Sequence, residues 1–267
     1  MIPPRLVAID LDGTLLRSDH TVSARSKAAI IAVRSAGIEV VVATARSPRS
    51  ARGLAAEAGI GGLAICANGA TVYDLDADRV VAHTPLPAAT AHRLVAGLRG
   101  RFPGIVFGWE YELRFGSEPA YEAQRNPEWW PRPEGSYEPC DPLAWTLPMT
   151  KLLARLPSAD LEQVLAVAAE IAGDDASTTL AGDAFVEVAA AGVSKEGALA
   201  QLAADRDVAP HEVVAFGDHL TDLAMVAWAG HGVAVANAHP SVLAVADEVA
   251  ASNDDDGVAI VLERLVG

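Results

Sequence analysis

The stretch Leu-Val-Ala-Ile-Asp-Leu-Asp-Gly-Thr, residues 6–14, gives the strongest indication of the fold. Its first four residues are apolar, and the run ends at two carboxylates one residue apart, Asp10 and Asp12. A short apolar run of this kind is typical of a strand buried on both faces of a parallel sheet. Open α/β sheets place their chemistry at the carboxyl ends of such strands. The stretch therefore predicts an α/β fold with a functional site directly after its first strand.

Asp10 and Asp12 are costly to remove from water unless a positive charge accompanies them. Two carboxylates at the end of a buried strand thus call for a cation and a fixed positive group nearby. An acidic turn closed by Gly13 explains one Asp and the Gly, but it gives no reason for the second Asp and Thr14 at this spacing. We therefore interpret the stretch as part of a site rather than as a turn alone.

The composition is that of a globular protein with an excess of acidic residues. The chain has 267 residues, of which 51% are hydrophobic and 21% charged, and its formal net charge is −15. This length allows one large or two modest domains with a sizeable core. The charge argues against nucleic acid or an anionic membrane as a general partner. It is compatible with a small anionic substrate, because a bound metal and a few basic side chains can dominate the field of one pocket.

The cysteines and the apolar segments indicate the compartment. Cys66 and Cys140 lie far apart without the spacing of metal ligands, which favours a reducing environment. The amino terminus passes straight into the first predicted strand without the pattern of a secretion signal. Every long apolar stretch is interrupted by a charge, Gly or His well short of a membrane span. We therefore expect a cytoplasmic protein, and leave its oligomeric state open.

Strands and helices alternate after the first strand. A helix is predicted over 23–36, where Ser23 can cap the start and Gly37 can end it. The β-branched run at 38–43 then leads into Thr44-Ala45-Arg46. A second buried strand thus ends in a hydroxyl and a guanidinium.

A third apolar strand is predicted at 63–66, after a helix that closes near Gly59. It ends in Asn68-Gly69, which is a turn signal. Asn68 is equally compatible with a turn residue and with a ligand contact.

The pattern changes beyond residue 84, and most of the prolines and four of the five tryptophans lie between residues 85 and 157. We expect a smaller α+β unit at 85–189, inserted between halves 1–84 and 190–267 of the first domain. Its helix at 88–99 is predicted to end at Gly100, and 118–142 gives no clear assignment. The pair Trp129-Trp130 is a candidate wall for substrate, but packed cover for a small sheet is the favoured interpretation.

The alternation of strand and helix returns in the last third. Ser194 can cap a helix that begins at Lys195. A further apolar strand, 213–216, ends in Gly217-Asp218-His219-Leu220-Thr221-Asp222. In a doubly wound sheet with right-handed crossovers, the carboxyl ends of the strands lie along one edge. Acidic groups, a hydroxyl and an ammonium are therefore expected around one point.

These residues in this order resemble the haloacid dehalogenase superfamily of phosphatases, in its Cof-type branch, subfamily IIB, with a C2B cap. Residues 10–14 match the first motif of that family, Thr44 the second, Lys195 the third, and Gly217-Asp218 with Asp222 the fourth. The similarity spans nearly the whole chain, since the inserted unit lies where that branch carries its cap. The resemblance implies a doubly wound Rossmann-like parallel sheet with an inserted α+β cap that sets substrate specificity.

The resemblance also implies the catalytic roles. Asp10 would attack phosphorus to form an aspartyl-phosphate, and Asp12 would carry the proton to the leaving alkoxide and later take it from water. Mg²⁺ would be held by Asp10, by the backbone carbonyl of Asp12 and by Asp218. Thr44 and Lys195 would bind the phosphoryl oxygens. Gly13 would let backbone N–H groups approach the phosphate.

Other residues near the motifs keep more than one interpretation. Asp222 is expected to support the metal site without binding the metal directly. Thr221 stands where the family commonly has Asn, and it either supplies a hydroxyl group near the metal or caps the next helix. Arg46 either contacts substrate, bridges to the inserted unit or forms a surface ion pair. Asn237 fits a family turn near the site or a purely structural turn. His219 is a candidate substrate contact, but an exposed loop residue is the favoured interpretation.

The predicted function is Mg²⁺-dependent hydrolysis of a small phosphorylated metabolite, with a sugar phosphate as one candidate. A phosphosugar mutase is the alternative among enzymes, and it would move phosphate between positions with little release. A non-catalytic protein that binds a phosphorylated ligand is the alternative from another class, although binding alone needs no nucleophile. Carbon–halogen hydrolysis ranks low, because it has no use for Asp12 as an acid or for the metal.

Overall fold

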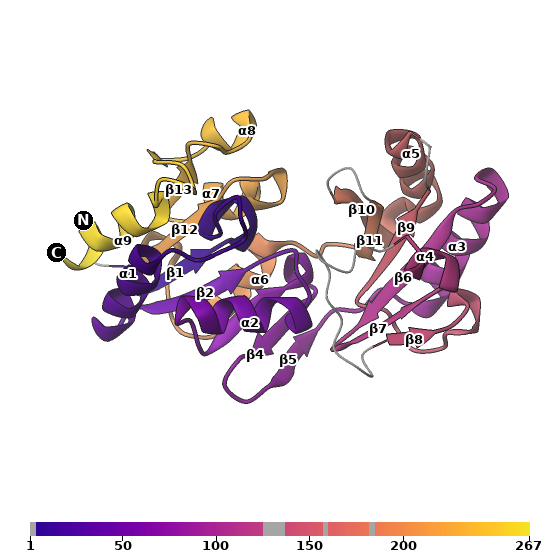
Figure 1. Ribbon diagram of the computed structural model, residues 1–267, viewed down its shortest axis with the longest axis horizontal. Coiled ribbons are helices and arrows are strands. Elements are labelled where there is room, and N and C mark those ends of the chain that lie inside the picture. The colour runs from indigo at the N-terminus through magenta and orange to yellow at the C-terminus, as the bar shows by residue number, and fades with distance from the viewer. Residues whose placement is uncertain (1–3, 125–136, 157–159, 182–184) are drawn as a thin grey trace. The chain divides into compact units, whose positions relative to one another are not determined.

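The chain folds into two units, shown in Figure 1. The structure, a computed structural model, describes residues 4–124, 137–156, 160–181 and 185–267. Met1–Ala82 with Ser194–Gly267 make up the core unit, and His83–Val193 make up the second unit. The second unit is thus an insertion between two segments of the core unit.

The core sheet has eight strands, in the order β14-β13-β12-β1-β2-β3-β4-β5. These strands are β1 (Leu6–Ile9), β2 (Glu39–Ala43), β3 (Leu63–Cys66), β4 (Thr71–Asp74), β5 (Arg79–His83), β12 (Val213–Gly217), β13 (His231–Val235) and β14 (Glu248–Ala250). The helices of this unit are α1 (Ala24–Ser35), α2 (Pro48–Ala58), α6 (Lys195–Ala204), α7 (Leu223–Trp228), α8 (Pro240–Leu243) and α9 (Gly257–Val266).

Strand β1 lies at the centre of this sheet. It pairs in parallel with β2 on one side and with β12 on the other. The chain proceeds outward through β2 and β3, and later from β12 through β13 to β14, so the strand order reverses at β1. Such a reversal opens a crevice at the carboxyl ends of the strands, where ligands bind in open α/β sheets. Strand β4 turns back, antiparallel to β3.

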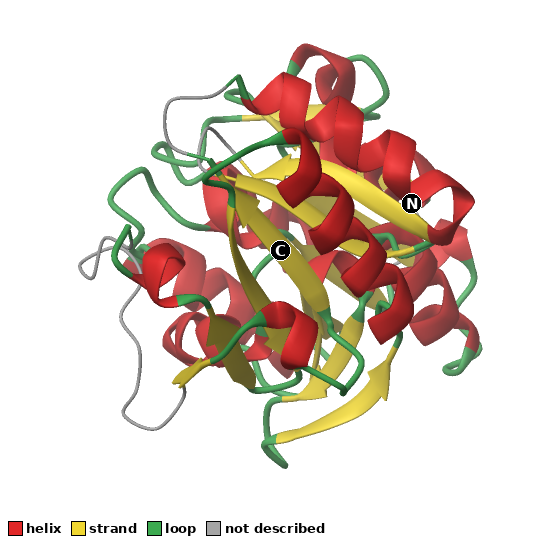
Figure 2. Cartoon of the chain, turned by 90° about the vertical axis from the view of Figure 1, so that its right-hand side faces the viewer, coloured by secondary structure: helices red, strands yellow, loops and turns green. Residues whose placement is uncertain are grey.

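Helices cover the core sheet, as Figure 2 shows by secondary structure. One apolar cluster joins strands β1 and β2 to α6 and α7, with Leu6, Val41, Leu199 and Met225 among its buried members. The alternate residues of β1 point to the opposite face. Helix α1 packs there against β2, α2 and α9. All four residues of β1 are buried, which explains its uninterrupted apolar sequence.

The second unit has a mixed sheet of six strands, in the order β10-β11-β9-β6-β7-β8. These strands are β6 (Val106–Tyr111), β7 (Arg114–Ser117), β8 (Tyr137–Pro139), β9 (Lys151–Arg155), β10 (Ala176–Ala181) and β11 (Phe185–Ala190). Its helices are α3 (Ala88–Arg101), α4 (Pro119–Glu122) and α5 (Leu161–Ala172). The sheet is antiparallel except for the pairing of β7 with β8.

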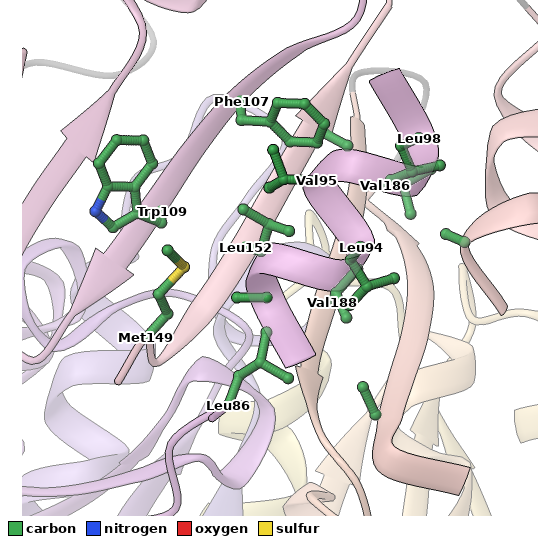
Figure 3. Packing of buried hydrophobic residues seen from close by; sticks show 14 of the residues in the cluster. Leu86, Leu94, Val95, Leu98, Phe107, Trp109, Met149, Leu152, Val186 and Val188 are labelled. Carbon is green, nitrogen blue, oxygen red and sulfur yellow. The ribbon is translucent and has the colours of Figure 1, made fainter. Parts of the chain in front are cut away.

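Figure 3 shows the core of the second unit, where α3 packs on the sheet. Leu94 and Leu98 of α3 meet Phe107 and Trp109 of β6 and Leu152 of β9 in one buried cluster. The sequence pattern predicted this helix to end at Gly100, but α3 continues through Arg101. A glycine inside a helix costs about 1 kcal/mol relative to Ala, which the packing of α3 outweighs.

The predicted fold class, a doubly wound parallel sheet with a separate α+β unit, is confirmed. Among the residues that the structure describes, no helix combines the length and the apolar character that crossing a bilayer requires. Trp129 and Trp130 lie outside the described residues, so their predicted packing role stays a prediction.

Candidate active site

Polar groups from three segments meet where β1 and β12 end. Asp10 directly follows β1, and its backbone N–H donates to the carbonyl of Phe216 in β12. Asp218 follows β12 itself, and Lys195 is the first residue of α6, after the N-cap Ser194. The parallel pairing of β1 with β12 therefore aligns two acidic strand ends side by side.

Lys195 is the centre of this cluster. Its Nζ donates to Oδ1 of Asp10 and to Oδ1 of Asp222, each at 2.6 Å. All three residues are buried, with exposed fractions of 2% for Lys195, 4% for Asp10 and 0% for Asp222. An ammonium group placed between two carboxylates replaces part of the hydration that burial removes from all three groups.

Asp222 also stabilises the loop that carries Asp218. Its Oδ2 accepts the backbone N–H groups of Asp218 at 3.2 Å and of His219 at 3.0 Å. Both carboxylate oxygens of Asp222 are thus engaged, one by Lys195 and one by this loop. A Cβ on Gly217 would lie 2.4 Å from Cβ of Asp222, so glycine is needed for this close approach.

The side chain of Asp218 is held by the loop that follows β1. Oγ1 of Thr14 donates to Oδ1 of Asp218 at 2.8 Å. Gly13 passes beneath the same carboxylate with φ of +77°, and a Cβ there would lie 2.5 Å from Oδ2 of Asp218. Gly13 therefore has both a conformational and a steric reason to be glycine. Thr14 belongs to the first motif, but the sequence alone predicted no role for its side chain.

Burial and like charge raise the pKa of the acidic members of the cluster. The pKa of Asp10 lies well above its ordinary value because of desolvation, which Lys195 opposes and the charges of Asp222 and Asp218 reinforce. Desolvation likewise raises the pKa of Asp218, although the hydrogen bond from Thr14 acts against it. Burial by itself would lower the pKa of Lys195, but Asp10 and Asp222 outweigh it and raise that pKa.

These groups fit a divalent cation. Asp10, Asp218 and Asp222 each offer a carboxylate oxygen, and these atoms all lie within 4.8 Å of one another. Three carboxylates against one ammonium leave an excess of two formal negative charges in a buried place, which a divalent ion would neutralise. Carboxylate oxygens are also the ligands that a hard ion such as Mg²⁺ prefers. Because both oxygens of Asp222 are engaged, Asp10 and Asp218 are the better direct ligands.

Asp12 lies apart from this cluster and pairs with Arg46. Nε of Arg46 donates to Oδ2 of Asp12 at 2.6 Å, and Nη2 donates to Oδ1 at 2.5 Å. The side chain of Asp12 is 43% exposed and that of Arg46 is 26% exposed. Of the three interpretations open for Arg46, the structure has an ion pair, and its partner is a motif residue rather than a distant surface group. Nothing in the sequence spacing pointed to this partner.

The remaining predicted residues lie around the same edge. Thr44 is fully buried after β2, and its Oγ1 accepts the backbone N–H of Arg46 at 3.1 Å. Nδ2 of Asn237 donates to the carbonyl of Gly13 at 2.8 Å, so the turn after β13 is tied to the loop after β1. Asn237 therefore combines the two roles that the sequence left open, a turn residue and a neighbour of the motifs.

Three other loop residues differ in their surroundings. His219 is exposed, in agreement with its expected place on a loop. Thr221 is half-buried within a short turn, and Asp222 rather than Thr221 occupies the N-cap position of α7. Asn68 has a left-handed conformation with φ of 56°, and its backbone N–H donates to the carbonyl of Thr44 at 3.0 Å.

Comparison with known proteins gives one consistent family. The family model described as haloacid dehalogenase-like hydrolase matches residues 7–262. A 5-amino-6-(5-phospho-D-ribitylamino)uracil phosphatase of Bacillus subtilis strain 168 is 27% identical over 280 residues, covering 98% of this chain and 96% of its own. A pyridoxal phosphate phosphatase of Escherichia coli strain K12 is 27% identical over 264 residues, covering 96% of each chain.

A solved structure agrees over the same length. A haloacid dehalogenase-like hydrolase from Bacteroides thetaiotaomicron superposes with a TM-score of 0.85 at 26% identity, covering 98% of this chain and 99% of its own. The match therefore includes both units of the chain and not only the strands that carry the motifs.

Proposed function

We propose that this chain, which belongs to the haloacid dehalogenase-like hydrolase family, is a Mg²⁺-dependent phosphomonoesterase that forms an aspartyl-phosphate on Asp10. The family resemblance inferred from the four motifs is confirmed. The enzyme is a phosphatase of small phosphorylated metabolites, as the two relatives described above are by name. Beyond this activity, we propose the identity of the metal, the covalent intermediate and the roles of the individual residues.

The observation that carries the proposal is the buried contact of Lys195 with Asp10 at the crevice of the core sheet. A buried carboxylate held by a fixed ammonium is a preorganised nucleophile, because Lys195 holds Oδ1 and leaves Oδ2 to attack. The same ammonium stabilises negative charge that develops on the phosphoryl oxygens. A protein that only binds a phosphorylated ligand has no use for a carboxylate beside the anion, since like charges repel.

The reaction proceeds in two steps. In the first, Asp10 attacks the phosphorus and the bond to the leaving oxygen breaks, while Asp12 gives its proton to that oxygen. In the second, water attacks the phosphorus of the phosphorylated Asp10, and Asp12 takes a proton from that water. Inorganic phosphate leaves, and both carboxyl groups return to their starting forms. Thr44 is assigned to the phosphoryl oxygens as a hydroxyl donor, and Gly13 to the approach of backbone N–H groups.

Asp10, Asp218 and the backbone carbonyl of Asp12 would hold Mg²⁺. When bound there, the ion would neutralise charge between the anionic nucleophile and the anionic phosphate. Asp222 supports the site through Lys195 and through the loop of Asp218. Thr221, which precedes Asp222 in the chain, is likewise assigned a supporting role at the metal site.

Recognition of the leaving group is assigned to the second unit, which we propose acts as the cap of the phosphatase. The named relatives act on a ribitylaminouracil phosphate and on pyridoxal phosphate, which share a phosphate ester on a small molecule and differ in the group that carries the ester. This shared chemistry supports a phosphate ester as the substrate but does not select one leaving group. A sugar phosphate is therefore one candidate among small metabolites.

The test is phosphate release from a panel of sugar phosphates, pyridoxal phosphate and 4-nitrophenyl phosphate. Wild type and Asp10→Asn are compared with Mg²⁺ and with a chelator. We expect metal-dependent release by wild type and its loss in Asp10→Asn, which keeps the size of the side chain and removes the nucleophile. Undiminished release by folded Asp10→Asn contradicts the proposal. Phosphate that moves between positions of a sugar with little release would instead identify a mutase.

A further inference from the structure

The ion pair of Arg46 with Asp12 has a geometry that a surface salt bridge does not need. We propose that Arg46 is a positioning residue that fixes the carboxyl group of Asp12 for proton transfer to and from the substrate. The inference rests on the proposed function, because it assigns a purpose to the proton carrier of that reaction. It differs from the substrate contact that the sequence suggested for Arg46.

The pair is bidentate. Nε and Nη2 of Arg46 donate to different oxygens of Asp12, at 2.6 Å and 2.5 Å. A planar guanidinium that binds both oxygens fixes the plane of the carboxylate as well as its distance. Each carboxylate oxygen has about two lone-pair sites, so each oxygen keeps a site that can carry or accept a proton.

Asp12 needs such a support because of where it lies. It belongs to the turn Leu11–Leu15, with φ of −74° and ψ of 120°, and Gly13 follows with φ of +77°. Its side chain is 43% exposed, whereas the neighbouring nucleophile Asp10 is buried against Lys195. A half-exposed Asp side chain in a turn rotates among several rotamers unless a partner selects one. A general acid has to lie within hydrogen-bond reach of its proton acceptor.

Arg46 is itself well anchored. Its backbone N–H donates to Oγ1 of Thr44 at 3.1 Å, and its carbonyl accepts the backbone N–H of Ala67 at 2.8 Å. Asn68 in turn donates to the carbonyl of Thr44 at 3.0 Å. The segment Thr44–Arg46 is thus fixed between the ends of β2 and β3, and its guanidinium reaches across to the loop after β1. Because Arg46 is itself held by the strand ends, its guanidinium keeps the carboxylate of Asp12 in a fixed position.

A second bidentate pair in the same unit provides a matched control. Nε and Nη2 of Arg25 donate to the two oxygens of Glu263 at 2.8 Å and 2.7 Å. This pair joins α1 to α9, and its side chains are 47% and 44% exposed. It has the same chemistry as the pair of Arg46 and no motif residue. Arg25→Gln therefore reports what the loss of a bidentate pair does to stability alone.

The experiment compares Arg46→Gln, Arg46→Lys and Arg25→Gln with wild type in the presence of Mg²⁺. The value of kcat/KM is measured for two substrates, the best alkyl phosphate of the panel and 4-nitrophenyl phosphate. An alkoxide leaves poorly without a proton, whereas nitrophenolate leaves without one. General acid catalysis contributes about 10²–10⁴-fold, so we expect Arg46→Gln to lower kcat/KM for the alkyl phosphate by at least about tenfold more than for the aryl phosphate.

The conservative variant Arg46→Lys and the control Arg25→Gln sharpen the outcome. We expect Arg46→Lys to recover part of the alkyl-phosphate activity, because an ammonium reaches one oxygen but does not fix the plane. Arg25→Gln should leave the ratio of the two kcat/KM values unchanged. If Arg46→Gln does not fold, Arg46→Lys replaces it in the comparison, and we then expect a smaller change in the ratio of the two kcat/KM values.

Three outcomes overturn the proposal. Equal losses for both substrates with raised KM identify Arg46 as a substrate-binding residue. Unchanged kinetics in folded Arg46→Gln identify a surface ion pair. A gain in alkyl-phosphate activity shows that Arg46 restrains Asp12 from reacting. Failure of the proposed function is distinct, because wild type would then release no phosphate or Asp10→Asn would remain active.

Discussion

Replacing Lys195 with Met removes the only ammonium that the described contacts place between Asp10 and Asp222. Met has a similar length and no charge, so the substitution changes electrostatics more than packing. Both carboxylates are buried, and neither can be rehydrated without opening the site. We expect a large loss of stability in the core unit when Mg²⁺ is absent.

The magnitude follows from the geometry of the pair. Removing one partner of a buried, hydrogen-bonded ion pair costs about 3–5 kcal/mol, because the remaining charge is left unpaired. For a domain of this size, each kcal/mol lowers Tm by roughly 2–4 °C. A loss near 4 kcal/mol thus lowers the Tm of the core unit by roughly 8–16 °C. The variant also has one more formal negative charge in excess than wild type, so Mg²⁺ should stabilise it more than it stabilises wild type.

The assay is thermal unfolding of Lys195→Met with a chelator and with a series of Mg²⁺ concentrations. Lys151→Met is the control, because Lys151 is also buried and its Nζ lies 2.7 Å from Oε1 of Glu187, but it belongs to the second unit. We expect both variants to be destabilised and only Lys195→Met to gain an increased response to Mg²⁺. A response of Lys195→Met to Mg²⁺ equal to that of wild type refutes the reasoning.

Three further predictions concern smaller features. Asp222→Asn deprives either the ammonium of Lys195 or two backbone N–H groups of an acceptor, so Mg²⁺ affinity measured by titration calorimetry should fall about 10–100-fold, and an unchanged affinity would argue against this support. Gly13→Ala places a Cβ 2.5 Å from Oδ2 of Asp218, so phosphate release should drop sharply while the second unit keeps its unfolding transition, and full activity would contradict the steric argument. Burial lowers the pKa of His83 below its ordinary value, so the folded chain takes up this proton at lower pH than the unfolded chain. The contribution of neutral His83 to the free energy of unfolding is therefore complete above about pH 6.5 and is lost as pH falls below it. Tm measured between pH 7.5 and 5 should fall less in His83→Gln than in wild type, and an equal fall of Tm with pH in both proteins would exclude His83 as the cause.

The strand ends of the core were predictable because their signals are local. Four short apolar runs are followed within two residues by Asp10, Thr44, Asn68 or Gly217, and a parallel sheet brings such ends to one edge. The start of α1 followed from Ser23, whose side chain accepts the N–H of Ser26 as a helix cap.

Features that depend on tertiary partners were not predictable. Strand β7 is defined by its pairing with β6 and β8, and its short sequence carries little periodicity of its own. The end of α3 was misplaced because Gly100 reads as a stop signal, while the packing of its apolar face decides the length. The contact of Arg46 with Asp12 joins residues 34 positions apart, and only the fold brings them together.

The most direct test of the central claim is to trap phosphate on Asp10. Wild type and Asp12→Asn are mixed with 4-nitrophenyl phosphate and Mg²⁺, quenched in acid within one turnover, and digested for mass spectrometry. The account predicts a phosphoryl group on the peptide that contains Asp10, and more of it in Asp12→Asn, because nitrophenolate leaves without a proton while the attacking water lacks its base. Burst release of nitrophenol without a phosphorylated peptide, or phosphate on another residue, would contradict the account.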